Sequence, residues 1–187
     1  MAHFTQKAIL QSFENMLYKM SFDKITVSAI VADCEISPNT FYYHYRDIYD
    51  LLIAWLEAKS KKYVEMISGC GWKEALKTLL RDIKETPEPV YHLSHSLSRE
   101  RVEKYVFETM NDEFYKFICS QTGECDIDSE TLRTISEYTC YAGVGFFVKF
   151  LWNNMKDDTD EAVDRIATIF DSCIEYAKEN KIEKFKK

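Results

Sequence analysis

Apolar residues recur at helical spacing along most of the chain, and they predict a protein built from helices. Outside a short segment near the N-terminus, the pattern predicts helices over roughly residues 4–20, 47–66, 72–83, 90–97, 99–120, 129–153 and 159–177. The alternating Val, Ile and Thr runs that favour strands are missing from the sequence. The expected fold class is therefore all-α, with about nine helices.

Two short helices joined by a tight turn are predicted between residues 26 and 45. Thr26 is a suitable N-cap for the first helix, in which Val27, Ile30 and Val31 recur at helical spacing. The turn at residues 34–36 interrupts it. Ser37-Pro38 then starts a second helix, because Ser is a good N-cap and Pro is favoured at the first helical position.

The second of these helices has two different sides. Phe41 and Tyr45 are four positions apart, so they are expected to pack inward against Ile30 and Val31. The opposite side then carries Asn39, Thr40, Tyr42, Tyr43 and His44. Two helices of this kind form a helix-turn-helix, whose second helix fits the major groove of DNA.

This segment resembles the TetR family of bacterial transcriptional regulators. The resemblance rests on Ile-Thr-Val at 25–27, on Thr-Phe-Tyr-Tyr-His-Tyr at 40–45 and on Asp-Leu-Leu at 50–52. It is specific over the first quarter of the chain, and the remainder agrees in length and helical pattern. It implies a homodimeric repressor or activator that binds a palindromic operator in double-stranded DNA. Residues 1–46 would form the three-helix DNA-binding domain, and residues 47–187 a regulatory and dimerisation domain with its first helix as connector.

The resemblance also assigns residues to DNA. One set is expected to hold phosphates: Thr26, Ser28, Thr40, Tyr42 and His44. A second set is expected to approach the edges of the bases: Ser37, Pro38, Asn39 and Tyr43. The family often has Arg or Lys where Ser28 and Ile48 stand here, which puts two of its usual phosphate contacts in question.

The charge of the chain does not by itself favour nucleic acid. The net charge is −7 at pH 7, and residues 1–46 contain as many acidic as basic side chains. The basic surface that usually accompanies DNA binding is therefore missing. Hydroxyl and amide groups can still contact phosphates, so we expect modest affinity with a weak dependence on salt.

The last two predicted helices are candidates for a dimer interface. Residues 138–152 are apolar nearly all round, and two glycines within them either permit the close approach of another helix or are simply tolerated. Dimerisation through these helices is a property of the family that the chain resembles. The predicted interface residues are Gly143, Gly145, Val163, Ile166, Phe170 and Cys173.

Control of the regulatory domain has two alternatives. A small-molecule effector would bind a pocket for which the candidates are Tyr105, Tyr141, Phe147 and Trp152, although core packing explains these aromatic residues equally well. The other alternative is a protein partner. Residues 22–27 and 49–52 resemble the TetR branch that includes activators of dihydroxyacetone kinase operons, in which such a module occurs.

Other functions find little support in the sequence. No catalytic motif is present, so we do not expect an enzyme, and no cofactor is indicated. His92 and His95 lack further ligands at metal-binding spacing, and the six cysteines form no CxxC pair. The N-terminus lacks the apolar core of a signal peptide, and residues 138–152 are too short to span a membrane. We therefore expect a cytoplasmic protein.

Overall fold

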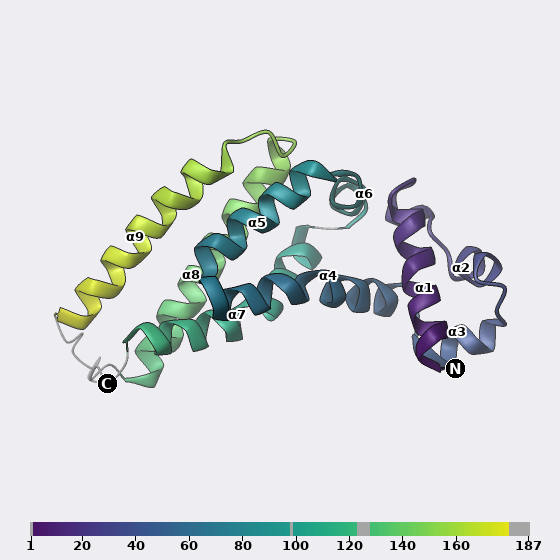
Figure 1. Ribbon diagram of the computed structural model, residues 1–187, viewed down its shortest axis with the longest axis horizontal. Coiled ribbons are helices and arrows are strands. Elements are labelled where there is room, and N and C mark those ends of the chain that lie inside the picture. Colours follow the sequence, from purple (N-terminus) through teal and green to yellow (C-terminus); the bar gives the residue numbers. More distant parts are fainter. Residues whose placement is uncertain (1, 98, 123–127, 180–187) are drawn as a thin grey trace. The chain divides into compact units, whose positions relative to one another are not determined.

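The computed structural model describes residues 2–97, 99–122 and 128–179, which form helices and no strand (Figure 1). The helices are α1 (Ala2–Leu17), α2 (Val27–Asp33), α3 (Pro38–His44), α4 (Ile48–Cys70), α5 (Trp72–Glu85), α6 (Glu88–Ser96), α7 (Arg99–Thr122), α8 (Ser129–Trp152) and α9 (Thr159–Glu179). A short 3-10 helix, η1 (Phe22–Lys24), lies in what the sequence predicts to be a link. The all-α prediction is confirmed.

The chain divides into two compact units that do not follow the sequence continuously. Unit 1 contains residues 1–62 and 85–99, and unit 2 contains residues 63–84 and 100–187. The helix α4 begins in unit 1 and ends in unit 2. The functional boundary at residue 46 is a different division, and it stays a prediction.

The core of unit 1 is built around Phe13 of α1. Its ring meets Phe22 and Trp55 edge-on, with centroids 6.2 and 6.1 Å away. The same core buries Ile30 of α2 and Phe41 of α3. Apolar residues from α1, α2, α3 and α4 therefore share one core, and this fixes the orientation of α3.

Unit 1 also contains α6, which lies far from the first helices in the sequence. Leu93 is buried in the core described above. The Nδ1 atom of His92 is 2.6 Å from the carbonyl oxygen of Leu17 at the end of α1, and the Ser96 hydroxyl donates to Asp23 at 3.1 Å. Because the last carbonyls of a helix have no partner within it, His92 satisfies an acceptor of α1. The ring nitrogen of His95 likewise lies 2.9 Å from the carbonyl oxygen of Tyr91.

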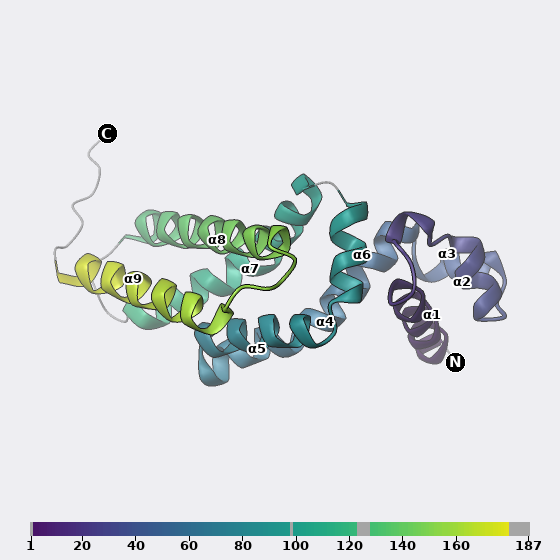
Figure 2. The same ribbon diagram turned by 90° about the horizontal axis from the view of Figure 1, so that it is seen from above.

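Unit 2 consists of the end of α4 together with α5, α7, α8 and α9, and Figure 2 shows α8 and α9 running side by side. Trp72 of α5 packs on Phe114 of α7 and Phe170 of α9, with ring centroids 6.2 and 5.6 Å apart. Two lysines of α5, Lys73 and Lys77, each place Nζ 2.7 Å from a carboxylate oxygen of Asp164 on α9. Aromatic contacts and ion pairs thus join α5 to α9.

Helix ends follow local chemistry. Gly71, with φ of +87°, adopts the left-handed conformation directly after the end of α4. Asp128 caps α8 by accepting from the backbone N–H groups of Glu130 and Thr131, both at 3.0 Å. No helix in the described ranges is long and apolar enough to cross a membrane.

Candidate nucleic-acid interface

The turn between α2 and α3 is set by three local features. The Thr26 hydroxyl accepts the Ala29 N–H at 3.2 Å, which caps α2. Glu35 has φ of +51°, and the Ile36 N–H donates to the carbonyl of Val31 at 3.1 Å. A residue with positive φ followed by such a long backward bond ends a helix sharply. The chain can therefore start α3 after only four intervening residues.

Ser37 and Pro38 start α3 as the sequence predicts. The Ser37 hydroxyl oxygen accepts the Thr40 N–H at 3.1 Å, and the two hydroxyl groups of Ser37 and Thr40 lie 2.8 Å apart. Pro38 occupies the first turn. Each hydroxyl retains further hydrogen-bonding capacity, because a Ser or Thr side chain has one donor and two acceptor sites.

The two sides of α3 are separated by burial. Phe41 and Tyr45 are buried in the core of unit 1, whereas Tyr42 is 57% exposed and Tyr43 is 81% exposed. Since each residue turns a helix by about 100°, Asn39 and Tyr43 lie on the face directly opposite Phe41. The predicted inward and outward sides of α3 are therefore confirmed.

The exposed rings of α3 are supported by their neighbours. Tyr42 contacts Phe41 edge-on with centroids 5.5 Å apart, and Tyr43 contacts His44 in the same way at 5.1 Å. Of the remaining predicted DNA-binding residues, Thr40 and His44 are half-buried and the others are exposed: Thr26, Ser28, Ser37, Pro38 and Asn39. All nine residues lie at the start of α2 or along α3 and its cap.

Arg46, the first arginine of the sequence, follows α3 by two residues and was not among the predicted contacts. Its side chain is 85% exposed, and its Nη2 atom lies 3.0 Å from a carboxylate oxygen of Asp50. The other oxygen of Asp50 accepts the Arg46 backbone N–H at 3.0 Å. These bonds lower the pKa of Asp50 and raise that of Arg46. The position of Arg46 as a lone cation directly after the tyrosine-rich motif is the sequence signal that could have identified it as a candidate DNA contact.

Tyr141, Phe147 and Trp152, three of the predicted effector residues, do not line the pocket of about 390 Å³ described below. Tyr141 is exposed and stacks on Phe107 with centroids 4.6 Å apart. Phe147 is half-buried near Phe150, and Trp152 is exposed. The side chain of Tyr105 lies outside the described residues.

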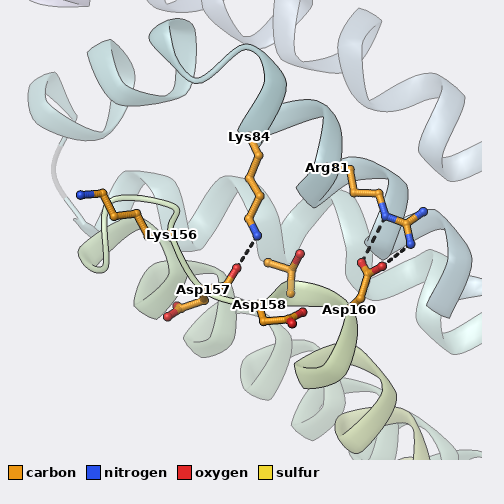
Figure 3. Close-up of a pocket in the computed structure, with 7 residues that line it drawn as sticks. Arg81, Lys84, Lys156, Asp157, Asp158 and Asp160 are labelled. Atoms are coloured by element: carbon orange, nitrogen blue, oxygen red, sulfur yellow. Dashed lines mark hydrogen bonds and ion pairs between the residues drawn. The ribbon is translucent and has the colours of Figure 1, made fainter.

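A pocket of about 390 Å³ lies elsewhere, where the end of α5 meets the turn between α8 and α9 (Figure 3). It is open and polar. Arg81 forms an ion pair with Asp160, and Lys84 donates a hydrogen bond to the carbonyl oxygen of Asp157. Two of the three cations that line the pocket, Arg81 and Lys84, are thus already engaged. The lining residues are Arg81, Lys84, Lys156, Asp157, Asp158, Thr159 and Asp160.

The predicted interface residues fall into two groups. Val163 and Phe170 are buried within unit 2, and Ile166 packs against the same core. Gly145 and Cys173 are exposed, and Gly143 is half-buried. A Cβ atom added to either glycine would have no other atom of the described chain within 4 Å. No other helix in the described part of the subunit therefore packs closely against these glycines.

An exposed apolar stripe runs along the outside of α8, and another runs along the outside of α9. Tyr138 and Trp152 are exposed on α8, in a helical series that includes Gly145. Ile169 and Tyr176 are exposed on α9, in a series that includes Cys173. Residues at these spacings share a helix face.

Comparisons with known proteins agree with this architecture. The TetR C-terminal family described as "Transcriptional regulator C-terminal region" matches residues 71–172, more than half of the chain. A solved structure named "Dihydroxyacetone kinase operon activator DhaS" is similar over 91% of this chain and 96% of its own, with a TM-score of 0.65 and 20% sequence identity. At that identity the likeness shows the fold. A search of curated proteins gives no match.

The family match covers unit 2 over most of its length, and the helix-turn-helix lies in unit 1, outside the matched residues. The fold match extends across both. The expected branch, that of dihydroxyacetone kinase operon activators, is the one that the similar structure represents. The chain therefore belongs to the TetR family of transcriptional regulators and is not an enzyme.

Proposed function

We propose that this regulator is a cytoplasmic homodimer that binds a palindromic operator in double-stranded DNA, with α3 of each subunit in the major groove of one half-site. The observation that carries the proposal is the exposed face of α3, held in place by the buried Phe41 and Tyr45. A two-fold dimer presents two such helices, which matches the symmetry of a palindrome.

Hydroxyl groups take the place of cations at the phosphates. The Thr26 hydroxyl uses an acceptor site for capping, so its O–H remains available to a phosphate oxygen. Ser28, Thr40, Tyr42 and His44 complete the phosphate set, while Ser37, Pro38, Asn39 and Tyr43 approach the bases. Phosphate contacts fix the position of the protein on the duplex, and base contacts supply the specificity.

The exposed stripes of α8 and α9 form the dimer interface. Their apolar members, Tyr138, Trp152, Ile169 and Tyr176, are all exposed to solvent in the described subunit. Burying them removes apolar surface from water, which is the main favourable term in protein association. Gly145 and Cys173 lie in the same stripes, and Gly145 allows the partner helix to approach closely. Val163 and Phe170 support the interface from beneath.

Residues 47–187 act as the regulatory domain, and α4 connects it to the DNA-binding helices. A small molecule that binds unit 2 and favours one position of α4 resets the spacing of the two α3 helices. The exposure of Tyr141 favours a second candidate, in which unit 2 binds a protein partner. Exposed aromatic side chains suit a protein contact better than an enclosed pocket.

Selection of genomic fragments tests DNA binding, with Tyr42→Ala as the informative variant. Loss of the Tyr42 contact is expected to weaken operator binding by about 1–3 kcal/mol without unfolding the protein. The matched control is Tyr18→Ala, which removes an exposed tyrosine ring at the end of α1. If wild-type protein selects no double-stranded DNA, the proposed function is wrong.

Sedimentation tests the dimer. Gly145→Arg and Ile169→Asp place a bulky charge on the exposed stripes without entering the core, so both are expected to give folded monomers with weakened operator binding. Asp171→Lys, at an exposed position outside the stripe of α9, is the control. A wild-type protein that sediments as a monomer at micromolar concentration contradicts the assignment.

Ligand screening separates the two regulatory candidates. A small molecule that raises the melting temperature of the dimer and changes its operator affinity supports the effector. Stabilising ligands that leave operator affinity unchanged contradict it. The protein-partner candidate is supported by a genomically neighbouring protein that binds unit 2 and loses affinity when Tyr141 is replaced by Ala.

A further inference from the structure

The helix that faces DNA carries no charged side chain. The seven residues of α3 include no Lys, Arg, Asp or Glu. The preceding helix, α2, contributes a single acidic residue, Asp33, at its last position. Arg46 is the next cation along the chain, and Asp50 holds it beyond the end of α3. Lys, Arg, Asp and Glu are therefore missing from the side chains of α3 that could recognise bases.

Two of these neutral groups occupy the outermost face of α3. Asn39 and Tyr43 lie one helical turn apart, directly opposite the buried Phe41. Asn39 is exposed, and its side-chain amide makes no hydrogen bond within the described part of the chain. Tyr43 is supported edge-on by His44 and projects outward. Both side chains are thus free to meet base edges.

The four bases differ in the side chains that read them. Guanine is read most often by Arg or Lys at O6 and N7, and cytosine by Asp or Glu at its N4 amino group. The face formed by Asn39 and Tyr43 has neither kind. An Asn amide matches adenine, because it accepts from the N6 amino group and donates to N7. An apolar ring surface matches the 5-methyl group of thymine.

From these matches we infer that the base pairs facing α3 in each half-site are A·T pairs, read by Asn39 at adenine and by Tyr43 at a thymine methyl group. Pro38, at the start of α3, adds apolar surface for a second methyl group. The inference rests on the proposed function and specifies the class of DNA that the same site binds.

Selection from a random duplex library gives the first test. Adjacent A·T pairs are expected at the centre of each selected half-site, where α3 docks. Selection of a half-site with a required G·C pair at the position contacted by Asn39 overturns this inference while leaving the proposed function intact. A library from which no duplex is enriched overturns both.

Base analogues give the sharper test, with the selected operator as probe. Replacing the contacted adenine by 7-deazaadenine removes the N7 acceptor, and wild-type affinity is expected to fall about 5- to 150-fold. Asn39→Ala is expected to bind both duplexes equally. Tyr18→Ala, at an exposed position that follows α1, serves as the control variant, because it should retain the full sensitivity to the analogue.

The thymine contact is tested in the same way. Deoxyuridine in place of the contacted thymidine removes one methyl group, and wild-type affinity is expected to fall about fourfold. Tyr43→Ala should no longer distinguish the two duplexes. Wild-type protein that is indifferent to both analogues overturns the inference, as does an Asn39→Ala variant that is as sensitive to 7-deazaadenine as wild type.

Discussion

At the scale of single residues, the ion pair between Arg46 and Asp50 determines how much positive charge stands beside α3. Arg46 is highly exposed, yet both oxygens of Asp50 bond to it, one at the guanidinium and one at the backbone N–H. A phosphate near the end of α3 must compete with this carboxylate. The pair therefore lowers the electrostatic share of DNA binding.

Releasing Arg46 should strengthen the general attraction to DNA. We expect Asp50→Asn to raise affinity for non-operator DNA and to steepen the plot of log affinity against log salt by about one unit, because one more phosphate is neutralised. Arg46→Ala should lower affinity for operator and non-operator DNA alike. Fluorescence anisotropy at several salt concentrations measures both effects. Glu57→Gln, an exposed acid on the same helix, controls for the change in net charge; an equal effect there would rule out the specific role of Asp50.

At the scale of elements, α6 packs with the predicted DNA-binding helices although it lies far from them in the sequence. Its Leu93 is buried with residues of α1, and the ring of His92 forms a hydrogen bond with the carbonyl oxygen at the end of α1. The stability of the core that positions α3 therefore depends partly on α6, which comes between α5 and α7 in the sequence.

Truncating Leu93 tests this dependence. Leu93→Ala should lower the free energy of unfolding of unit 1 by about 2–5 kcal/mol, because it removes buried apolar surface and leaves a cavity. Operator binding should then be lost at a lower temperature than in wild type. Urea unfolding and anisotropy on a temperature series measure the two effects. Tyr91→Phe, which keeps the ring on the exposed side of α6, should change the free energy by no more than about 0.5 kcal/mol.

The ion pairs that join α5 to α9 should make the stability of unit 2 depend on pH. The hydrogen bonds from Lys73 and then Lys77 lower the pKa of Asp164 in the folded protein. A lowered folded pKa gives stability that is present above the ordinary aspartate pKa of about 3.9 and is lost as the pH falls through the folded value. Asp164→Asn should therefore have a lower melting temperature than wild type near pH 6, and the difference should shrink below pH 4. A difference in melting temperature that stays constant down to about pH 3 would contradict this cause.

Element types were predictable because they depend on local chemistry. Caps such as Thr26 and Ser37, the prolines at 87 and 89 and the glycine at 71 mark helix ends in the sequence itself. The start of α9 was predicted less well. Thr and Asp residues all favour an N-cap, so the sequence alone leaves Asp158, Thr159 and Asp160 as candidates; in the structure Asp158 accepts the Glu161 N–H at 3.4 Å and α9 begins at Thr159.

Partnerships between helices were harder to predict. Periodicity finds an apolar stripe on α9, including Val163 and Phe170, but it cannot say which neighbour covers that stripe. The core of unit 2 takes up both residues, and the outward series at Ile169 and Tyr176 becomes apparent once the helices are packed. For α3 the outcome was better, because buried Phe41 and Tyr45 alternate with exposed residues within a single motif.

At the scale of the whole molecule, an acidic protein has to bind an acidic polymer. The chain carries a net charge of −7, and residues 1–46 contribute none of it. Binding must then depend on hydroxyl, amide and ring contacts more than on the release of counterions. The wild-type protein should accordingly show a shallow loss of operator affinity as salt is raised.

Adding one cation at the interface should change that behaviour. Ser28 is exposed at the start of α2, and Ser28→Arg should raise operator affinity at low salt while steepening the salt plot by about one unit. Thr168→Arg places the same charge on exposed α9 and should alter the slope much less. Equal slopes for the two variants would argue that overall charge, rather than contact at α2, controls the response.

The two units alternate along the sequence, and this limits which chimeras can be made with other regulators. The N-terminal residues 1–62 lack Leu93 and His92, so a chimera that joins them to another regulator leaves the core and the end of α1 incomplete. The shortest continuous segment that carries all of unit 1 is residues 1–99, and it includes α5, whose Trp72 belongs to the core of unit 2. Neither half can be exchanged without cutting into the other. The DNA specificity of this protein should therefore be easier to change by point substitution on α3 than by exchange of its N-terminal residues.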